Sequence, residues 1–318
     1  MIHVELRKLS PEDCVKLAKI TKYARQGTPV DSDKTIEEIS KNIEDLSISD
    51  GYRIFIALDD VENIVGWIYY YVGFPLMSFI GGFLPLVDET RESEEIAISL
   101  IEASKKDIVE NERSRLEIEL VLPTHEHRSY SKRFVEWYRK CGFKLAAEEI
   151  HMKTDLSGME LPDLNLPKGY TLKKFSEVPY EKLKDSGFRT LKESKEGLFL
   201  SMNHAEQEVT LEYFFDRSKP YIEDASLILE KDGEIIGFVI TRMNDDDEPE
   251  IGPVGIVPEA RGEGLATYLL VRVLKNLKDS GATNACLDTT VTNFPAQGLY
   301  RRYSFKEVYF KQFYYWSP

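Results

Sequence analysis

The strongest local signal in the sequence is the stretch Ile251-Gly-Pro-Val-Gly-Ile-Val-Pro-Glu-Ala-Arg-Gly-Glu-Gly-Leu-Ala-Thr-Tyr-Leu-Leu270. Small and branched residues at its start predict a strand, and its end predicts an apolar-faced helix that begins at about Gly264. Gly262 and Gly264 allow the backbone between them to approach a ligand, because no Cβ is in the way. The first N–H groups of a helix lack internal partners and can bind a pyrophosphate, beside which Arg261 would add a permanent cation. The alternative is an ordinary strand-to-helix turn that binds nothing.

The patterns around this stretch occur twice in the chain. Residues 54–67 and 226–238 both have the pattern of an apolar strand, a polar turn and a second strand. In each copy the second strand begins with two apolar residues, a glycine and an aromatic residue, and the two glycines, Gly66 and Gly237, are 171 residues apart. Tyr138-Arg-Lys-Cys-Gly-Phe143 is matched by Tyr300-Arg-Arg-Tyr-Ser-Phe305 at an offset of 162. Matches in the same order at similar offsets indicate two copies of one domain.

The join between the copies is expected in residues 155–169, where two prolines and two glycines interrupt any apolar period. We therefore predict domains at 1–157 and 168–318. Each copy alternates strands with helical segments, which predicts an α/β or α+β fold with helices covering a central sheet. One helix is expected at 34–46, with its isoleucines on one face, and a matching helix at 203–215.

Composition limits the class of protein. The 318 residues hold 41 Lys and Arg against 55 Asp and Glu, a net charge of −14 that argues against a nucleic-acid binder. Cys14, Cys141 and Cys286 are far apart, as expected of buried thiols in a reducing compartment. No apolar run approaches membrane-spanning length and the start does not resemble a signal peptide, so we expect a cytoplasmic protein without a membrane partner. A metal is not expected, because His125-x-His127 lacks a third partner.

Two motifs carry a resemblance to a known family. Residues 254–266 resemble the acetyl-CoA signature of the GNAT superfamily of N-acetyltransferases, whose Arg/Gln-x-x-Gly-x-Gly/Ala falls on Arg261, Gly264 and Ala266. Asn293-Phe-Pro-Ala-Gln-Gly-Leu-Tyr300 resembles the second signature, although Ser304 stands where the family usually has glycine. The resemblance covers 170–318. Together with the repeat it implies two tandem GNAT-like domains, each a mixed, mostly antiparallel sheet flanked by helices.

The resemblance implies acetyl-CoA as cofactor, CoA as product, and no metal. Backbone near Ile256 would donate a hydrogen bond to the thioester carbonyl, residues 261–267 would surround the pyrophosphate, and Asn293 would hydrogen-bond the pantetheine arm. The cofactor-binding residues expected on this basis are Val254, Gly255, Ile256, Arg261, Gly262, Glu263, Gly264, Leu265, Ala266, Thr267 and Asn293.

The resemblance also implies direct transfer of the acetyl group to a primary amine in a ternary complex. Tyr300 would protonate the departing thiolate, unless it is simply a core tyrosine. Glu250 is the candidate base, with Glu248 and Asp288 as alternatives; Glu250 could equally be a solvated residue next to the hairpin loop. The acceptor would be a small-molecule or peptide amine. The rival function is an acyl-CoA-binding sensor or scaffold without turnover.

The first copy lacks the glycine turn. Its Glu92 and Glu94 align with Gly262 and Gly264, and carboxylates there would repel a pyrophosphate. Residues 1–157 are therefore predicted to be a degenerate, non-catalytic domain that is structural or helps to form the acceptor site. In the closing strand at 310–316, Tyr314 and Trp316 are further candidates for contact with the acceptor.

Overall fold

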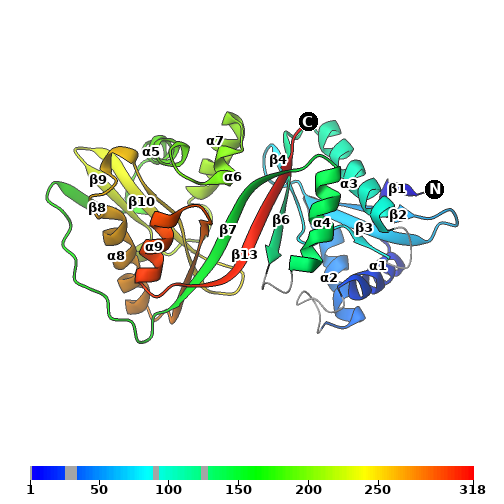
Figure 1. Cartoon of the computed structure of the whole chain (residues 1–318), viewed down its shortest axis with the longest axis horizontal. Coiled ribbons are helices and arrows are strands. Elements are labelled where there is room, and N and C mark those ends of the chain that lie inside the picture. Colours follow the sequence, from blue (N-terminus) through cyan, green and yellow to red (C-terminus); the bar gives the residue numbers. More distant parts are fainter. Residues whose placement is uncertain (1, 26–33, 89–92, 123–127) are drawn as a thin grey trace. The chain divides into compact units, whose positions relative to one another are not determined.

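The computed structural model describes residues 2–25, 34–88, 93–122 and 128–318. The chain forms two compact units (Figure 1): Met1–Ala146 with Phe310–Pro318, and Ala147–Tyr309. His125 and His127, and Arg91 and Glu92 of the first copy's turn, lie outside the described residues. Among the helices that are described, none combines the length and the apolar character that crossing a membrane requires.

In the first unit the sheet has the order β1-β2-β3-β4-β6-β13, with β5 paired to β3. Its described pairs are antiparallel except for β4 with β6. The elements are β1 (His3–Leu6), α1 (Pro11–Ala24), α2 (Ile36–Ile48), β2 (Tyr52–Leu58), β3 (Ile64–Tyr71), β4 (Met77–Ile80), β5 (Leu86–Val87), α3 (Ser93–Glu110), β6 (Arg115–Leu122), α4 (Arg128–Lys140) and the end of β13 (Lys306–Trp316).

In the second unit the sheet has the order β7-β12-β11-β10-β9-β8, and of its described pairs β11 with β12 is parallel. The elements are β7 (Lys144–Asp155), β8 (Tyr170–Lys174), η2 (Phe175–Glu177), α5 (Tyr180–Lys192), α6 (Gly197–Leu200), α7 (His204–Phe214), η3 (Glu223–Ala225), β9 (Leu227–Lys231), β10 (Glu234–Met243), β11 (Pro249–Ile256), η4 (Pro258–Ala260), α8 (Leu265–Asp279), β12 (Asn284–Thr290) and α9 (Phe294–Arg302). The predicted fold class, mixed sheets flanked by helices, is confirmed in both units.

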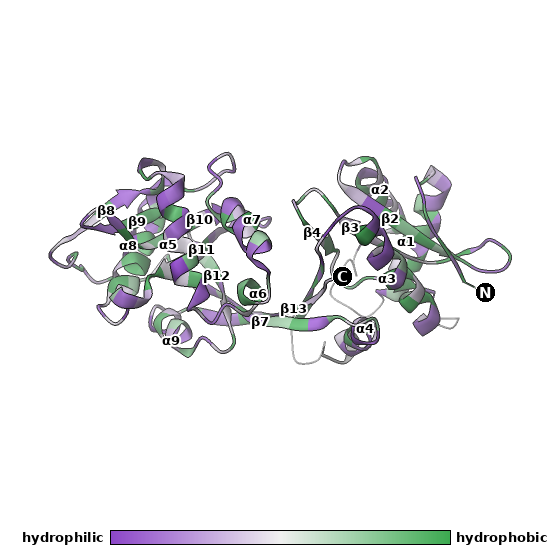
Figure 2. Ribbon diagram, turned by 90° about the horizontal axis from the view of Figure 1, so that it is seen from above, coloured by the Kyte–Doolittle hydropathy of each residue, from purple (hydrophilic) through white to green (hydrophobic). Residues whose placement is uncertain are grey.

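The repeated glycines allow close packing in the two units. A Cβ on Gly66 would lie 2.8 Å from a side-chain carbon of Ile96 on α3, and one on Gly237 would lie 2.5 Å from Ile256 and 3.6 Å from Leu269 on α8. Gly66 therefore allows α3 to pack closely on β3, and Gly237 allows the side chain of Ile256 on β11 to lie close to β10. Figure 2 shows apolar residues along strands such as β2 and β3, where these helices cover the sheet.

The predicted amphipathic helix at 34–46 is confirmed as α2, and the matching helix at 203–215 as α7. Each begins with a capping box: Thr35 and Glu38 cap α2, and Asn203 and Glu206 cap α7. These caps satisfy backbone N–H groups that the first helical turn leaves without partners. On α2 the isoleucines of the predicted face pack into the core of the first unit, with Ile39 and Ile43 buried.

The matching Tyr-to-Phe segments form the same turn. The Phe143 N–H donates to the Tyr138 carbonyl at 3.0 Å, and the Phe305 N–H donates to the Tyr300 carbonyl at 3.2 Å. The residue before each phenylalanine is left-handed, with φ of +82° at Gly142 and +61° at Ser304. The sequence repeat is thus a repeat of structure down to single hydrogen bonds.

The unit boundaries differ from the predicted domain limits of 157 and 168. Residues 156–169 do connect β7 to β8 without helix or strand, as the proline and glycine content indicated. However, β7 pairs with β12 of the second unit, and Phe310–Trp316 of β13 pairs with β6 of the first. The chain therefore changes unit within two strands, and composition does not reveal which sheet a strand joins. As a result Tyr314, 1% exposed, lies in the core of the first unit with Trp316 packed beside it.

Candidate functional site

A cavity of about 890 Å³, called the pocket below, lies within the second unit. It is formed by the segment after α5, by α7 and β11, by the start of α8 and by the ends of β12 and α9. This volume is in the range typical of small-molecule and cofactor sites. The predicted site residues that line it are Glu250, Val254, Gly255, Ile256, Arg261, Gly262, Gly264, Leu265, Ala266, Thr267, Asn293 and Tyr300.

Glu263 is the predicted residue that does not line the pocket. Its carboxylate instead accepts a hydrogen bond from the Tyr170 hydroxyl at 2.6 Å, which ties the glycine turn to β8. The Glu263 side chain is therefore not one of the groups in 261–267 that face a ligand. Its bond to Tyr170 holds the glycine turn in place instead.

Strand β11 has an edge that no strand covers along most of its length. The described residues of β11 and β12 pair at one position, Glu250 with Cys286. On its other side β11 pairs with β10 as far as Ile256. Residues 251–256, which line the pocket, thus present backbone groups to a ligand that could extend the sheet as an additional strand.

The turn before α8 suits an anion. Gly262 and Gly264 have φ of +85° and +81°, and a Cβ on either would meet nothing within 4 Å. Gly264 is also the N-cap of α8, and no side chain caps this end of the helix. The backbone N–H groups of the first turn therefore point to the pocket with the positive end of the helix dipole, as at phosphate-binding helix termini.

Arg261 is more constrained than a free cation. Its guanidinium donates to the carbonyls of Ile256, Glu193 and Thr190 at 3.1, 2.9 and 3.0 Å. These bonds join the end of β11 to the C-terminal end of α5. Arg261 still contributes a positive charge to the pocket lining, and its hydrogen bonds also fix the position of the turn.

Tyr300 lies on α9 with 7% of its surface exposed, and its side chain lines the pocket. Burial, and secondly the charge of Glu196, raise the pKa of its phenol above the ordinary value. The phenol is therefore protonated across the physiological pH range and can act as a proton donor.

The carboxylates predicted as bases occupy different environments. Glu250 and Asp288 both line the pocket, where Asp288 also lies 2.7 Å from the ring of His151, whereas Glu248 is ion-paired with Lys153. Cys286, beside them on β12, is fully buried, and burial followed by the charge of Glu250 raises the pKa of its thiol to about 12. The thiol is thus a packed group, as predicted, and not a nucleophile.

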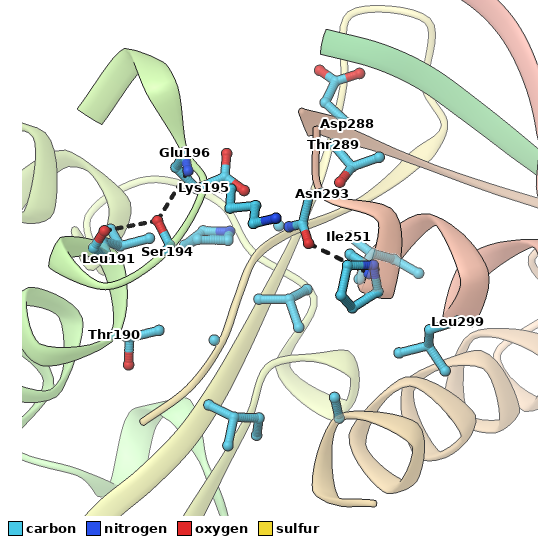
Figure 3. Close-up of a pocket in the computed structure, with 18 of the residues that line it drawn as sticks. Thr190, Leu191, Ser194, Lys195, Glu196, Ile251, Asp288, Thr289, Asn293 and Leu299 are labelled. Atoms are coloured by element: carbon cyan, nitrogen blue, oxygen red, sulfur yellow. Dashed lines mark hydrogen bonds between the residues drawn. The ribbon is translucent and has the colours of Figure 1, made fainter. Parts of the chain in front are cut away.

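Glu196 was not predicted from the sequence. It follows α5, lines the pocket near Asn293 and accepts a hydrogen bond from the Thr290 hydroxyl at 3.1 Å (Figure 3). Burial raises its pKa, while hydrogen bonds from Thr290 and Asn293 oppose the rise. Asn293 also caps α9 through its carbonyl oxygen, at 3.4 Å from the Ala296 nitrogen. No motif marks Glu196, since it lies in a connection between helices.

Comparisons with known proteins agree with this geometry. Residues 192–305 match the model of the Acetyltransferase (GNAT) family. The mycothiol acetyltransferase of Thermomonospora curvata is 30% identical over 163 residues, which are 49% of this chain and 50% of that protein. The chain thus matches about half the length of its curated relatives.

Two solved structures resemble the whole chain. One is a GCN5-related N-acetyltransferase from Sphaerobacter thermophilus, with a TM-score of 0.59, 15% identity and coverage of 99% of this chain and 95% of that one. The other is a tandem GNAT protein from the clavulanic acid biosynthesis pathway, with a TM-score of 0.56, 13% identity and coverage of 100% and 98%. At these identities they show the fold alone. Residues 192–305, within the second unit, therefore form a domain of the Acetyltransferase (GNAT) family.

Proposed function

We propose that this chain is an acetyl-CoA-dependent N-acetyltransferase that acts on a primary amine, with the reaction catalysed in its second unit. The observation that carries the proposal is the position of Tyr300. Its buried phenol lines the same pocket as the uncovered edge of β11 and the uncapped start of α8. A proton donor, a strand edge and an anion site are thus combined in one cavity.

The residues present fit acetyl-CoA. Residues 251–256 offer a strand edge for the pantetheine amides, and the backbone of 262–267 offers N–H groups for the pyrophosphate. The side-chain amide of Asn293, which lines the pocket, is in reach of the same arm. When bound, acetyl-CoA supplies an activated acetyl group whose transfer releases the CoA thiol.

Two side chains would transfer protons. Tyr300 donates its phenolic proton to the leaving sulfur, because its raised pKa keeps it protonated until that step. Glu250, in the pocket lining, accepts a proton from the amine. Glu250→Gln should lower kcat and remove the acidic limb of its pH profile, whereas an unchanged profile would assign the base elsewhere.

The first unit is proposed to bind no acetyl-CoA. Its Tyr138, which corresponds to Tyr300, has no exposed surface and donates its hydroxyl to the Leu84 carbonyl at 2.8 Å. Strand β4 pairs with β6 at four described positions, and β11 pairs with β12 at one. The Tyr138 hydroxyl is thus used by a backbone carbonyl in the first unit.

Release of thiol from acetyl-CoA, measured with a panel of primary amines, tests the proposed function. Acetylation of any amine, with loss of turnover in Tyr300→Phe, would support it. The relatives named mycothiol acetyltransferase favour a small-molecule acceptor, and peptide arrays would reveal a protein or peptide acceptor instead. Binding of acetyl-CoA without turnover across a broad panel would favour a sensor or scaffold.

A further inference from the structure

Glu196 is held in place by contacts of its backbone and of its carboxylate. Its backbone N–H donates to the Ser194 hydroxyl at 3.0 Å, and that hydroxyl donates to the Leu191 carbonyl at 2.7 Å, which fixes the segment after α5 (Figure 3). The Thr290 hydroxyl, on the last residue of β12, donates to its carboxylate at 3.1 Å. The side chain therefore has a defined position at the end of β12.

The contacts of Glu196 are hydrogen bonds from neutral donors. In the part of the chain that the structure describes, its carboxylate forms no ion pair; the adjacent Lys195 is exposed and also lines the pocket. Glu196 is half-buried, and because partial removal from water disfavours a charged carboxylate, its pKa is raised. A ligand that carries a positive charge would compensate this charge.

The other candidate carboxylates differ in this respect. Glu248 has the Lys153 ammonium as partner, and Asp288 has His151. Glu196 is also the carboxylate whose charge acts on the phenol of Tyr300. A cation bound by Glu196 would thus lie near the proposed proton donor, where the acceptor amine must meet the acetyl group.

Apolar residues follow Glu196 in the chain and line the same pocket. They include Leu198 and Phe199 on α6, and Met202 after it. We propose that Glu196 binds the ammonium group of the acceptor, and that the acceptor carries an apolar group that packs against Leu198, Phe199 and Met202. This inference rests on the proposed function and assigns Glu196 to acceptor binding, distinct from the proton transfer proposed for Glu250.

The test uses hexylamine as a minimal probe, because it is cationic at neutral pH and has an apolar chain. Its affinity for the complex of the full chain with CoA is measured by calorimetry, and KM and kcat are measured by thiol release from acetyl-CoA. Glu196→Gln retains an oxygen that can accept the Thr290 bond and removes only the charge. We expect it to weaken hexylamine binding and raise its KM about tenfold or more, with acetyl-CoA affinity unchanged.

Two controls separate charge from structure. Glu234→Gln makes the same charge change at an exposed residue at the start of β10 and should leave both constants unchanged. If Glu196 only supports Thr290, then Glu196→Ala will be impaired and Glu196→Gln will behave as wild type, which would overturn the inference. Absence of hexylamine binding to the wild-type complex would also overturn it. If hexylamine binding depends on Glu196 but no amine is acetylated, the proposed function is wrong and the binding site stands.

Discussion

Tyr300 and Tyr138 occupy the same turn in the two units but differ in what their hydroxyls contact. Tyr138 donates to a backbone carbonyl, whereas Tyr300 lines the pocket. We predict that Tyr300→Phe lowers kcat by about 10²- to 10⁴-fold, the usual contribution of a general acid, with little change in acetyl-CoA affinity. Steady-state kinetics with any accepted amine measures this effect.

Tyr138→Phe is the matched control. It should leave kcat unchanged and lower the free energy of unfolding by about 1–3 kcal/mol, because the Leu84 carbonyl loses its buried donor. Denaturant titration of the two variants compares them directly. A Tyr300→Phe variant that loses stability but retains its rate would mean that Tyr300 is a core tyrosine, the alternative that the sequence left open.

The charged carboxylate of Glu196 should lower the free energy of unfolding at neutral pH. Because burial raises its pKa in the folded state, folding favours the protonated form, and stability falls as pH rises from the unfolded pKa through the folded one. Glu196→Gln removes this penalty. We predict a Tm that is higher than that of the wild type at neutral pH. The difference should disappear below the unfolded pKa; an equal difference at acid pH would contradict this explanation.

Most of the site residues predicted from the sequence motifs line the pocket, because a strand, a glycine turn and a helix start are local features. Glu196 was missed for a physical reason. Its environment is created by Thr290 and Asn293, almost a hundred residues later, and no local pattern records that approach. The side chain of Glu263 lies within the motif but bonds to Tyr170, so a motif position does not determine where a side chain points.

At the scale of elements, the turn after α9 contains a strained residue. Ser304 has φ of +61°, where the equivalent Gly142 has +82°. A side chain in the left-handed region costs more than glycine does, so Ser304→Gly should stabilise the second unit by about 0.5–1 kcal/mol. Thermal unfolding measures the gain. Ser304→Ala keeps the Cβ and should give none, and an equal gain in both variants would show that the hydroxyl, not the backbone, is responsible.

Helices were easier to predict than strand membership. Apolar spacing and capping residues lie within each helix, so α2 and α7 begin within two residues of the predicted segments. Strands β7 and β13 have ordinary strand sequences, and nothing in them specifies which sheet they join. That choice depends on pairing with β12 and β6, which is settled only when the whole chain folds.

At the scale of the whole molecule, the chain contains two related units whose ligand-facing groups have diverged. The second keeps the open glycine turn and an uncovered strand edge. In the first, the described contact of Tyr138 with the Leu84 carbonyl uses the hydroxyl equivalent to that of Tyr300. The central claim is therefore that one acetyl-CoA binds per chain, in the second unit.

Calorimetric titration of the full chain with acetyl-CoA tests this claim, using Gly264→Glu and Gly281→Glu as a matched pair. Both glycines have positive φ and open space, but Gly264 begins α8 at the pocket and Gly281 follows its other end. Backbone strain is thus similar in the two variants. We predict one site per wild-type chain, no binding in Gly264→Glu and normal binding in Gly281→Glu. Two equal sites per chain, or unchanged binding in Gly264→Glu, would contradict the account.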